Sequence, residues 1–192
     1  MRALRASEYF GAEVLVLDTG KYGALAMTGE ELDHFLADSD VVMLASLRRD
    51  GAPFVVPVGF DWDGASFFVT VALDHGLLHR MRRDPRVSLA VSSHPAFPTR
   101  FVVVEGVAEE LPDPDHAVSR RILFRKSEEM FARVEVDREQ FFAQWISVGR
   151  IVFRIRVSSL TTFDGTKVRR GATYSAGARL PTDSPRPGDS SR

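Results

Sequence analysis

Residues 41–92 read VVMLASLRRDGAPFVVPVGFDWDGASFFVTVALDHGLLHRMRRDPRVSLAVS, and this stretch decides the fold. Three β-rich runs, at 41–47, 54–60 and 66–72, are separated by the turns Arg48-Arg49-Asp50-Gly51 and Asp61-Trp62-Asp63-Gly64. Asp-Gly supplies the positive φ angles that a tight hairpin needs. The first run is almost wholly apolar, which predicts a strand buried on both faces. A short helix at 74–83, ending at Asp84-Pro85, leads to a fourth strand at 87–92.

This order of elements resembles the pyridoxamine-phosphate-oxidase-like split-barrel flavoproteins. Within that superfamily it is most similar to the actinobacterial flavin/deazaflavin-dependent oxidoreductases. The resemblance is carried by residues 44–53, 55–58, 62–64 and 82–87 in this order and spacing, and it covers roughly residues 28 to 167. It implies a mainly β (α+β) chain, folded as an antiparallel split β-barrel with flanking helices.

The chain of 192 residues suits one domain. We predict an N-terminal extension at 1–27, the split-barrel domain at 28–170 and a disordered tail at 171–192. The tail is rich in Gly, Ser, Pro and Arg and has too few bulky apolar residues to offset its ordering entropy.

Three further helices are predicted from their first residues. Thr28 and Glu31 have the spacing of a capping box. Asp113, followed by proline, starts a long helix. Asp137 caps a short helix that Gly149 ends. Strands are expected at 100–109, where Gly106 marks a bulge or a close backbone approach, and at 151–157.

Composition narrows the class of protein. The chain has 25 basic and 26 acidic residues, and a net charge of −1 argues against nonspecific nucleic-acid binding. It has no cysteine, which excludes disulfides and thiolate chemistry. No apolar run approaches the ~20 residues of a membrane span. We therefore expect a soluble cytoplasmic protein without membrane or nucleic-acid partners.

Motifs for other chemistries are absent. The sequence has no Gly-x-Ser-x-Gly, His-Glu-x-x-His or phosphate-binding P-loop pattern. His75 and His79 have the i, i+4 spacing of two metal ligands, but no third ligand is near them in sequence. No metal site is predicted.

A flavin needs flat apolar walls for its ring, and amides and a cation for its phosphate. Val56 and Val58 share one strand face, and Pro57 between them has no N–H to donate. In the resembling family this strand lies against the ring. Thr70, with Val71 beside it, and the helix start at His75 would then face the phosphate. The alternative is that these are ordinary barrel residues.

The sequence departs from the resembling family at Leu77, which occupies the expected lysine position and cannot neutralise a phosphate. His75, His79, Arg80 or Arg100 could supply the missing charge, or the arginines could simply be solvated. The other alternative is that phosphate affinity has been lost. Tyr22, Trp62 and Trp145 are possible wall residues, though core or dimer packing fits each as well.

The resemblance implies an oxidoreductase that uses FMN, or the 8-hydroxy-5-deazaflavin coenzyme F420, to move a hydride to or from a small organic substrate. Pyridoxamine phosphate oxidation itself is not expected, because the basic pattern for that substrate is not recognisable after Trp145. The family also implies a homodimer with cofactor sites between subunits. The alternatives are a non-catalytic binder of flavin, haem or an apolar ligand, and a structural dimer with an empty cleft. No catalytic proton donor can be named.

Overall fold

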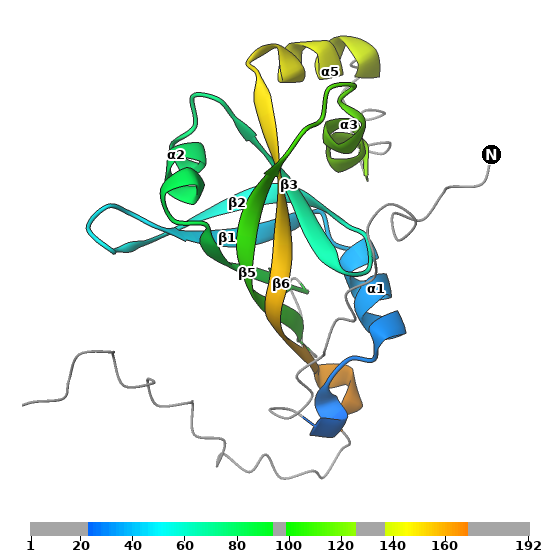
Figure 1. The fold of residues 1–192 in the computed structure, drawn as a ribbon. Coiled ribbons are helices and arrows are strands. Elements are labelled where there is room, and N and C mark those ends of the chain that lie inside the picture. Colours follow the sequence, from blue (N-terminus) through cyan, green and yellow to red (C-terminus); the bar gives the residue numbers. More distant parts are fainter. Residues whose placement is uncertain (1–22, 94–98, 126–136, 169–192) are drawn as a thin grey trace, which may run out of the picture.

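A computed structural model describes residues 23–93, 99–125 and 137–168. These residues form a closed, six-stranded antiparallel barrel with four α-helices (Figure 1). The strand order around the barrel is β1-β2-β3-β6-β5-β4. This confirms the predicted mainly β fold. Tyr22, most of the predicted N-terminal extension and the predicted tail lie outside the described residues.

The strands are β1 (Val41–Leu47), β2 (Pro53–Trp62), β3 (Ser66–Ala72), β4 (Arg86–Ser92), β5 (Arg100–Leu111) and β6 (Arg150–Asp164). The helices are α1 (Gly29–Ala37), α2 (Gly76–Arg83), α3 (Ala117–Phe124) and α5 (Arg138–Ser147), with 3-10 turns at Gly23–Leu25 and Gly165–Lys167. The predicted bounds of β1 and β3 are confirmed. The strand predicted at 151–157 is too short, because β6 continues to Asp164, which pairs with Arg100 at the start of β5.

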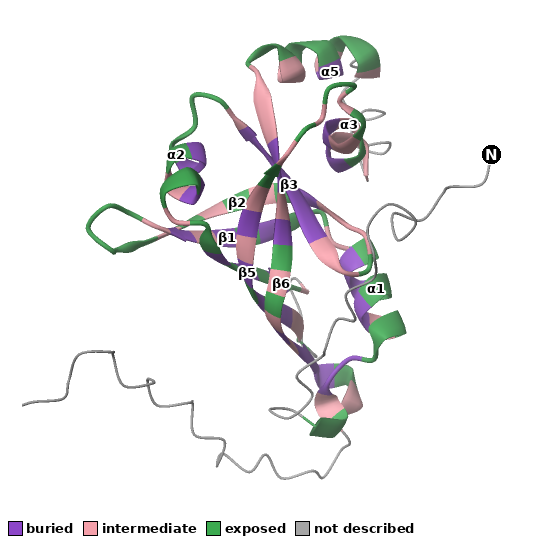
Figure 2. Ribbon diagram, viewed as in Figure 1, coloured by how far each residue is buried: buried purple, intermediate pink, exposed green. Residues whose placement is uncertain are grey.

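The burial of β1 differs from the prediction. Val42 and Leu44 point into the barrel and are fully buried, but Val41 and Met43 are 48% and 44% exposed. Figure 2 shows a similar alternation along β5, whereas β3, on which α3 packs, is buried at five successive residues. The expectation of burial on both faces is wrong, because an antiparallel barrel strand turns only alternate residues inward. The apolar outer residues of β1 therefore need another explanation.

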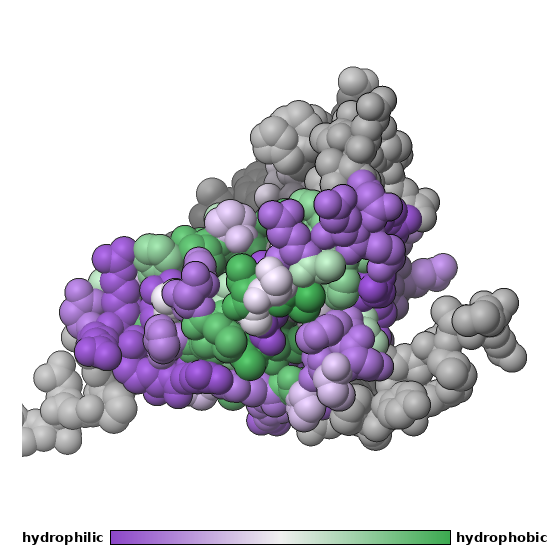
Figure 3. All heavy atoms as spheres, turned by 90° about the horizontal axis from the view of Figure 1, so that it is seen from above, coloured by the Kyte–Doolittle hydropathy of each residue, from purple (hydrophilic) through white to green (hydrophobic). Residues whose placement is uncertain are grey.

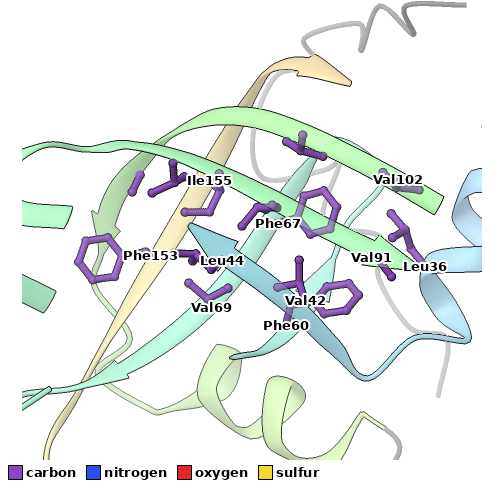
Figure 4. Packing of buried hydrophobic residues seen from close by; sticks show 14 of the residues in the cluster. Leu36, Val42, Leu44, Phe60, Phe67, Val69, Val91, Val102, Phe153 and Ile155 are labelled. Carbon is purple, nitrogen blue, oxygen red and sulfur yellow. The ribbon is translucent and has the colours of Figure 1, made fainter. Parts of the chain in front are cut away.

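The core fills the barrel with aliphatic and aromatic side chains (Figure 4). Phe60 and Phe67 pack with ring centroids 5.5 Å apart. Leu36 of α1 reaches the same cluster and closes one end of the barrel. Met81 of α2 joins it from the helix between β3 and β4.

The helix caps follow the predicted residues in two of three cases. The Thr28 hydroxyl accepts the Glu31 amide, and the Glu31 carboxylate accepts the Thr28 amide, so the capping box is confirmed. Asp137 caps α5, also as predicted. The predicted start of the third helix at Asp113 is wrong, because α3 begins at Ala117. The Asp113 carboxylate instead accepts the amides of Val118 and Ser119 across the turn that precedes the helix.

Strand β2 changes partners along its length. Residues 53–59 pair with β1, whereas only residues 60–62 pair with β3, at 67–69. The other edge of β3 pairs with β6 along all of residues 66–72, so residues 70–72 have β6 as a partner but not β2. β2 and β3 therefore separate beyond Phe60 and Val69, and this split shapes the site described below.

Gly106 combines both predicted features, because β5 shifts register between Glu105 and Gly106 and the backbone of β6 lies close. A Cβ atom at Gly106 would lie 2.6 Å from the Arg156 carbonyl oxygen and 2.8 Å from Ile155 Cγ2. We predict that Gly106→Ala lowers the free energy of unfolding by about 1–3 kcal/mol, measured by urea denaturation. Gly29→Ala, where nothing lies within 4 Å, is the control and should cost nothing. Equal stability of the two variants would contradict this prediction.

Candidate cofactor site

The split between β2 and β3 forms one wall of a pocket of about 480 Å³. This volume is within the range of roughly 300–1,000 Å³ that is usual for small-molecule sites. The remaining walls come from the first turn of α2, the end of α3, Trp145 of α5 and the start of β6. Figure 1 shows α2 on one side of these strands and α3 and α5 on the other. The view onto this end shows hydrophobic residues in the middle, framed by hydrophilic ones (Figure 3).

The walls of the pocket are largely apolar. Val56 and Val58 of β2 are half-buried and pack against the core. Ile122 and Leu123 of α3 line the pocket as well. α3 packs on β2 and β3, so the helix and the two strands bound the same space. The arrangement suits a flat apolar group between strand and helix.

Arg150 provides a fixed positive charge in this pocket. Its Nε donates to the Trp145 carbonyl oxygen (3.0 Å), and its Nη1 donates to Thr70 Oγ1 (3.2 Å). The guanidinium carbon lies 3.6 Å from the centre of the Trp145 ring. Burial lowers the pKa of Arg150, while the charge of Asp74 opposes that shift. The group remains cationic because arginine starts from so high a pKa.

His75 caps α2 and lines the pocket. Its Nδ1 accepts the amide of Leu77 at 3.2 Å. A neutral imidazole that accepts at Nδ1 carries its proton on Nε2, which is therefore a donor. The amides of Leu77 and Leu78 are used by the His75 side chain and carbonyl oxygen, and the positive end of the helix dipole favours negative charge here. This corner of the pocket thus presents hydrogen-bond donors.

Arg125 stands at another part of the lining. It donates to the carbonyl oxygens of Phe60 (3.2 Å) and Leu36 (2.7 Å), and its guanidinium carbon lies 4.6 Å from the centre of the Phe60 ring. Burial lowers the pKa of Arg125, and the charges of Asp61 and Asp40 oppose that shift. The residue ties the end of α3 to the barrel.

The structure brings six of the nine predicted cofactor residues into this pocket. They are Val56, Pro57, Val58, Thr70, Val71 and His75. Leu77 also contributes to the lining, but only 1% of it is exposed and it belongs to the core.

The other three predicted residues are not among the residues that line the pocket. His79 is exposed on α2. The Arg80 guanidinium lies over Phe54, and the Arg100 guanidinium lies over Phe35 of α1, 5.1 Å from the ring centre. Arg100 is the first residue of β5 and contacts α1, which does not line the pocket.

Sequence reasoning missed Asp40, Arg125 and Arg150, and it treated Trp145 only as one possible wall residue. No local pattern marks them, because Arg150 reaches the pocket through the register of β6, Arg125 through the packing of α3, and Asp40 through its place before β1. Trp62, the other tryptophan considered, donates from Nε1 to Asp33 and packs against Phe67, so its role is structural.

Among the described residues, no helix is long and apolar enough to cross a membrane. The same residues include no group of three or more His, Asp or Glu side chains placed to hold a metal ion.

Comparison with known proteins identifies a family and a fold. The family model described as pyridoxamine 5'-phosphate oxidase matches residues 28–162. Comparison with curated proteins finds no match. The conserved hypothetical protein Rv2991 of Mycobacterium tuberculosis is similar in structure, with a TM-score of 0.63 and 24% identity, over 76% of this chain and 89% of that one.

Two other similar structures differ in what their names say they bind. An F420 reductase has a TM-score of 0.52 and 20% identity, over 67% of this chain and 94% of that one. HutZ, a heme storage protein of Vibrio cholerae, has a TM-score of 0.53 and 16% identity, over 72% of this chain and 97% of that one. These identities establish the shared fold alone.

We predict that Arg125→Met lowers the free energy of unfolding by about 2–4 kcal/mol, because two carbonyl oxygens lose a charged donor in the interior. Urea denaturation measures the change. Arg121→Met is the matched control on α3. It removes a surface ion pair with Asp61, in which Arg121 is 50% exposed, and should cost less than about 1 kcal/mol. A loss for Arg125→Met no larger than that of the control would contradict the anchoring role.

Proposed function

The chain belongs to the pyridoxamine 5'-phosphate oxidase family, and from its pocket we propose that it is an oxidoreductase that binds a phosphorylated flavin or deazaflavin. It would transfer a hydride between FMN, or the deazaflavin coenzyme F420, and a small organic substrate. The observation that carries the proposal is an apolar slot between two separated strands, with a hydroxyl, a guanidinium and an imidazole donor in its lining.

The slot fits the ring of such a cofactor. Val56 and Val58 offer an apolar strand wall, and Ile122 belongs to the helix that packs over these strands. Residues 56–59 of β2 have no β3 partner, so their strand edge is available to the polar edge of a ring. The name of the F420 reductase agrees with this class of ligand.

The donors of the pocket fit a phosphate. Thr70 supplies a hydroxyl, His75 supplies Nε2–H, and Arg150 supplies the positive charge that Leu77 lacks. Hydrogen bonds between charged partners are the stronger kind. The basic residue that is missing from α2 is thus replaced, in this proposal, by one from β6.

When bound, a flavin or deazaflavin itself supplies the site that accepts or donates the hydride. The chain's own residues would bind and orient the ring and keep water from its face. Trp145, held under the Arg150 guanidinium, would cover part of the pocket. A proton donor is not required of the side chains named here.

The alternative is a non-catalytic binder, and the name of HutZ makes haem one ligand to test. The hydrogen bond that His75 accepts at Nδ1 disfavours this residue as a haem ligand. A histidine that ligates iron through Nε2 needs its proton on Nδ1, but Nδ1 here accepts the Leu77 amide. We therefore favour the flavin or deazaflavin over haem.

We also propose that the chain forms a homodimer through the outer face of β2, β1, β4 and β5. Pro57, Met43, Ala90 and Val103 are exposed and form one cross-strand row in that order. An exposed apolar row of this kind marks a contact surface.

Charge at the two ends of β1 favours a second copy as the occupant of this face. Asp38 precedes the strand, and Arg49 follows it. A two-fold axis through the middle of β1 would place the acidic end of one copy against the basic end of the other. Because the row includes Pro57, which also lines the pocket, the second copy would lie beside the cofactor site.

The proposed function is tested by titrating the purified protein with FMN, riboflavin, F420 and haemin, following fluorescence quenching and absorption. We predict that FMN binds more tightly than riboflavin. We also predict that Arg150→Met and His75→Asn each weaken FMN about tenfold while leaving riboflavin nearly unchanged. Asparagine keeps the helix cap, so the second change removes the imidazole Nε2–H without removing the cap.

His79→Asn is the control, because His79 is exposed on the same helix and does not line the pocket. Transfer of a hydride from the reduced cofactor to an acceptor then separates an enzyme from a binder. Absence of binding by both cofactors would overturn the oxidoreductase proposal, and tight binding of haemin alone would support the alternative.

For the dimer, we predict that Val103→Glu shifts the molecular mass measured by light scattering from two chains to one, because it buries a carboxylate in the apolar row. Val148→Glu places the same change on another exposed valine, at the end of α5, and should leave the mass at two chains. A wild-type chain that is monomeric at the same concentration would refute the interface.

A further inference from the structure

The arginines of α2 are of two kinds. Arg82 forms an ion pair with Glu110, with its Nε 2.6 Å from the carboxylate. Arg80 points to the other side of the helix, where the charges of Arg48 and Arg83 act on it. Surface arginines elsewhere on the barrel, such as Arg86 and Arg121, pair with acids. The surroundings of Arg80 therefore need an explanation.

Arg80 is held from several sides but is not fully satisfied. Its Nε donates to Ser46 Oγ at 3.1 Å, and its guanidinium carbon lies 4.3 Å from the centre of the Phe54 ring. The guanidinium carbon of Arg48 lies 4.7 Å from the same ring centre. The Nη2 atom of Arg80 is buried and has no hydrogen-bond partner among the described residues. Two guanidinium groups thus contact one aromatic ring, and one of them has an unused donor.

This arrangement is costly in the free protein. Burial, and the positive charges of Arg48 and Arg83, lower the pKa of Arg80. A buried donor without an acceptor destabilises the folded protein, and does so more when it is charged. An oxyanion would relieve both the repulsion and the unmet donor. Ser46 could join it, because its oxygen accepts from Arg80 and its own O–H can still donate.

The position of Arg80 connects it with the pocket. A Cβ atom at Gly76 would lie 3.1 Å from Arg80 Nη1, so the guanidinium lies against the first turn of α2. Gly76 stands between His75 and Leu77, which both line the pocket. Phe54 precedes the pocket residue Val56 by two positions on β2. The arginine pair is therefore beside the pocket, on the side of α2 that faces the turn between β1 and β2.

We propose that Arg80 and Arg48, with the Ser46 hydroxyl, form a second oxyanion subsite that takes a phosphate or carboxylate group. It is separate from the donors at Thr70, His75 and Arg150. The group could belong to the far end of the ligand in the pocket or to a separate small anion. Only the first source rests on the proposed function.

The experiment compares the wild type with Arg80→Gln, Gly76→Ala and the control Arg82→Gln. Gly76→Ala shifts the guanidinium by a few tenths of an ångström without removing it, and alanine suits a helix, so this variant tests the subsite even if Arg80→Gln folds poorly. The first readout is the rise in Tm produced by inorganic phosphate and pyrophosphate without flavin, at an ionic strength matched with chloride. The second is the ratio of the affinities for FAD and FMN, since FAD carries one more phosphate.

The expected result is loss of the phosphate-induced rise in Tm in Arg80→Gln, a smaller rise in Gly76→Ala and the full rise in Arg82→Gln. A fall in FAD affinity relative to FMN, of about tenfold in Arg80→Gln and less in Gly76→Ala, would assign the group to the ligand of the pocket. An unchanged ratio together with a lost Tm rise would assign it to a separate anion. If both variants match Arg82→Gln in both readouts, the subsite is refuted. Absence of flavin binding by every protein would refute the proposed function and leave the phosphate readout to decide the subsite.

Discussion

The change of partner along β2 is the constraint on which the site depends. β2 pairs with β1 along residues 53–59 but with β3 only at residues 60–62, whereas β3 keeps its pairing with β6 along its whole length. The barrel is nevertheless closed, since three residues of β2 still pair with three of β3. The core lies where the strands pair, and the pocket lies where they part. A stable barrel and an open strand edge are thus obtained from the same two strands.

Charge is distributed in the way that this division predicts. Away from the split, several arginines of the barrel surface pair with carboxylates. Arg154 and Arg156, for example, both pair with Glu109. At the split, Arg150 donates hydrogen bonds to a hydroxyl and a carbonyl oxygen and not to a carboxylate. Beside it, one donor of Arg80 has no partner among the described residues. A net charge of −1 conceals this difference. Local excess positive charge, and not overall composition, is what an anionic ligand would meet.

The sequence predicted the elements better than it predicted the site. Turns are local, so Gly51 and Gly64 take the positive φ values expected of them (+83° and +96°), and the bounds of β1 and β3 follow. The length of β6 was underestimated, because its second half is stabilised by pairing with β5 and not by its own pattern. The start of α3 was misplaced because Asp113 bonds amides five and six residues ahead. Residues on β2 and β3 near the split were found, since a family motif runs through them, whereas Arg150 depends on register and had no signal.

Arg150 also changes how the departure at Leu77 is interpreted. Read along the chain, a leucine in place of a lysine removes a charge from the start of α2. In the folded chain, β6 pairs with β3, so that Arg150 is opposite Ala72 and its guanidinium reaches back to Thr70. Leu77 instead packs in the core, where it is 1% exposed. A positive charge in a pocket is a property of the space and not of one sequence position, and a strand neighbour can provide it as well as a helix. The loss of a family residue is therefore weak evidence for the loss of a binding site until the strand register is known.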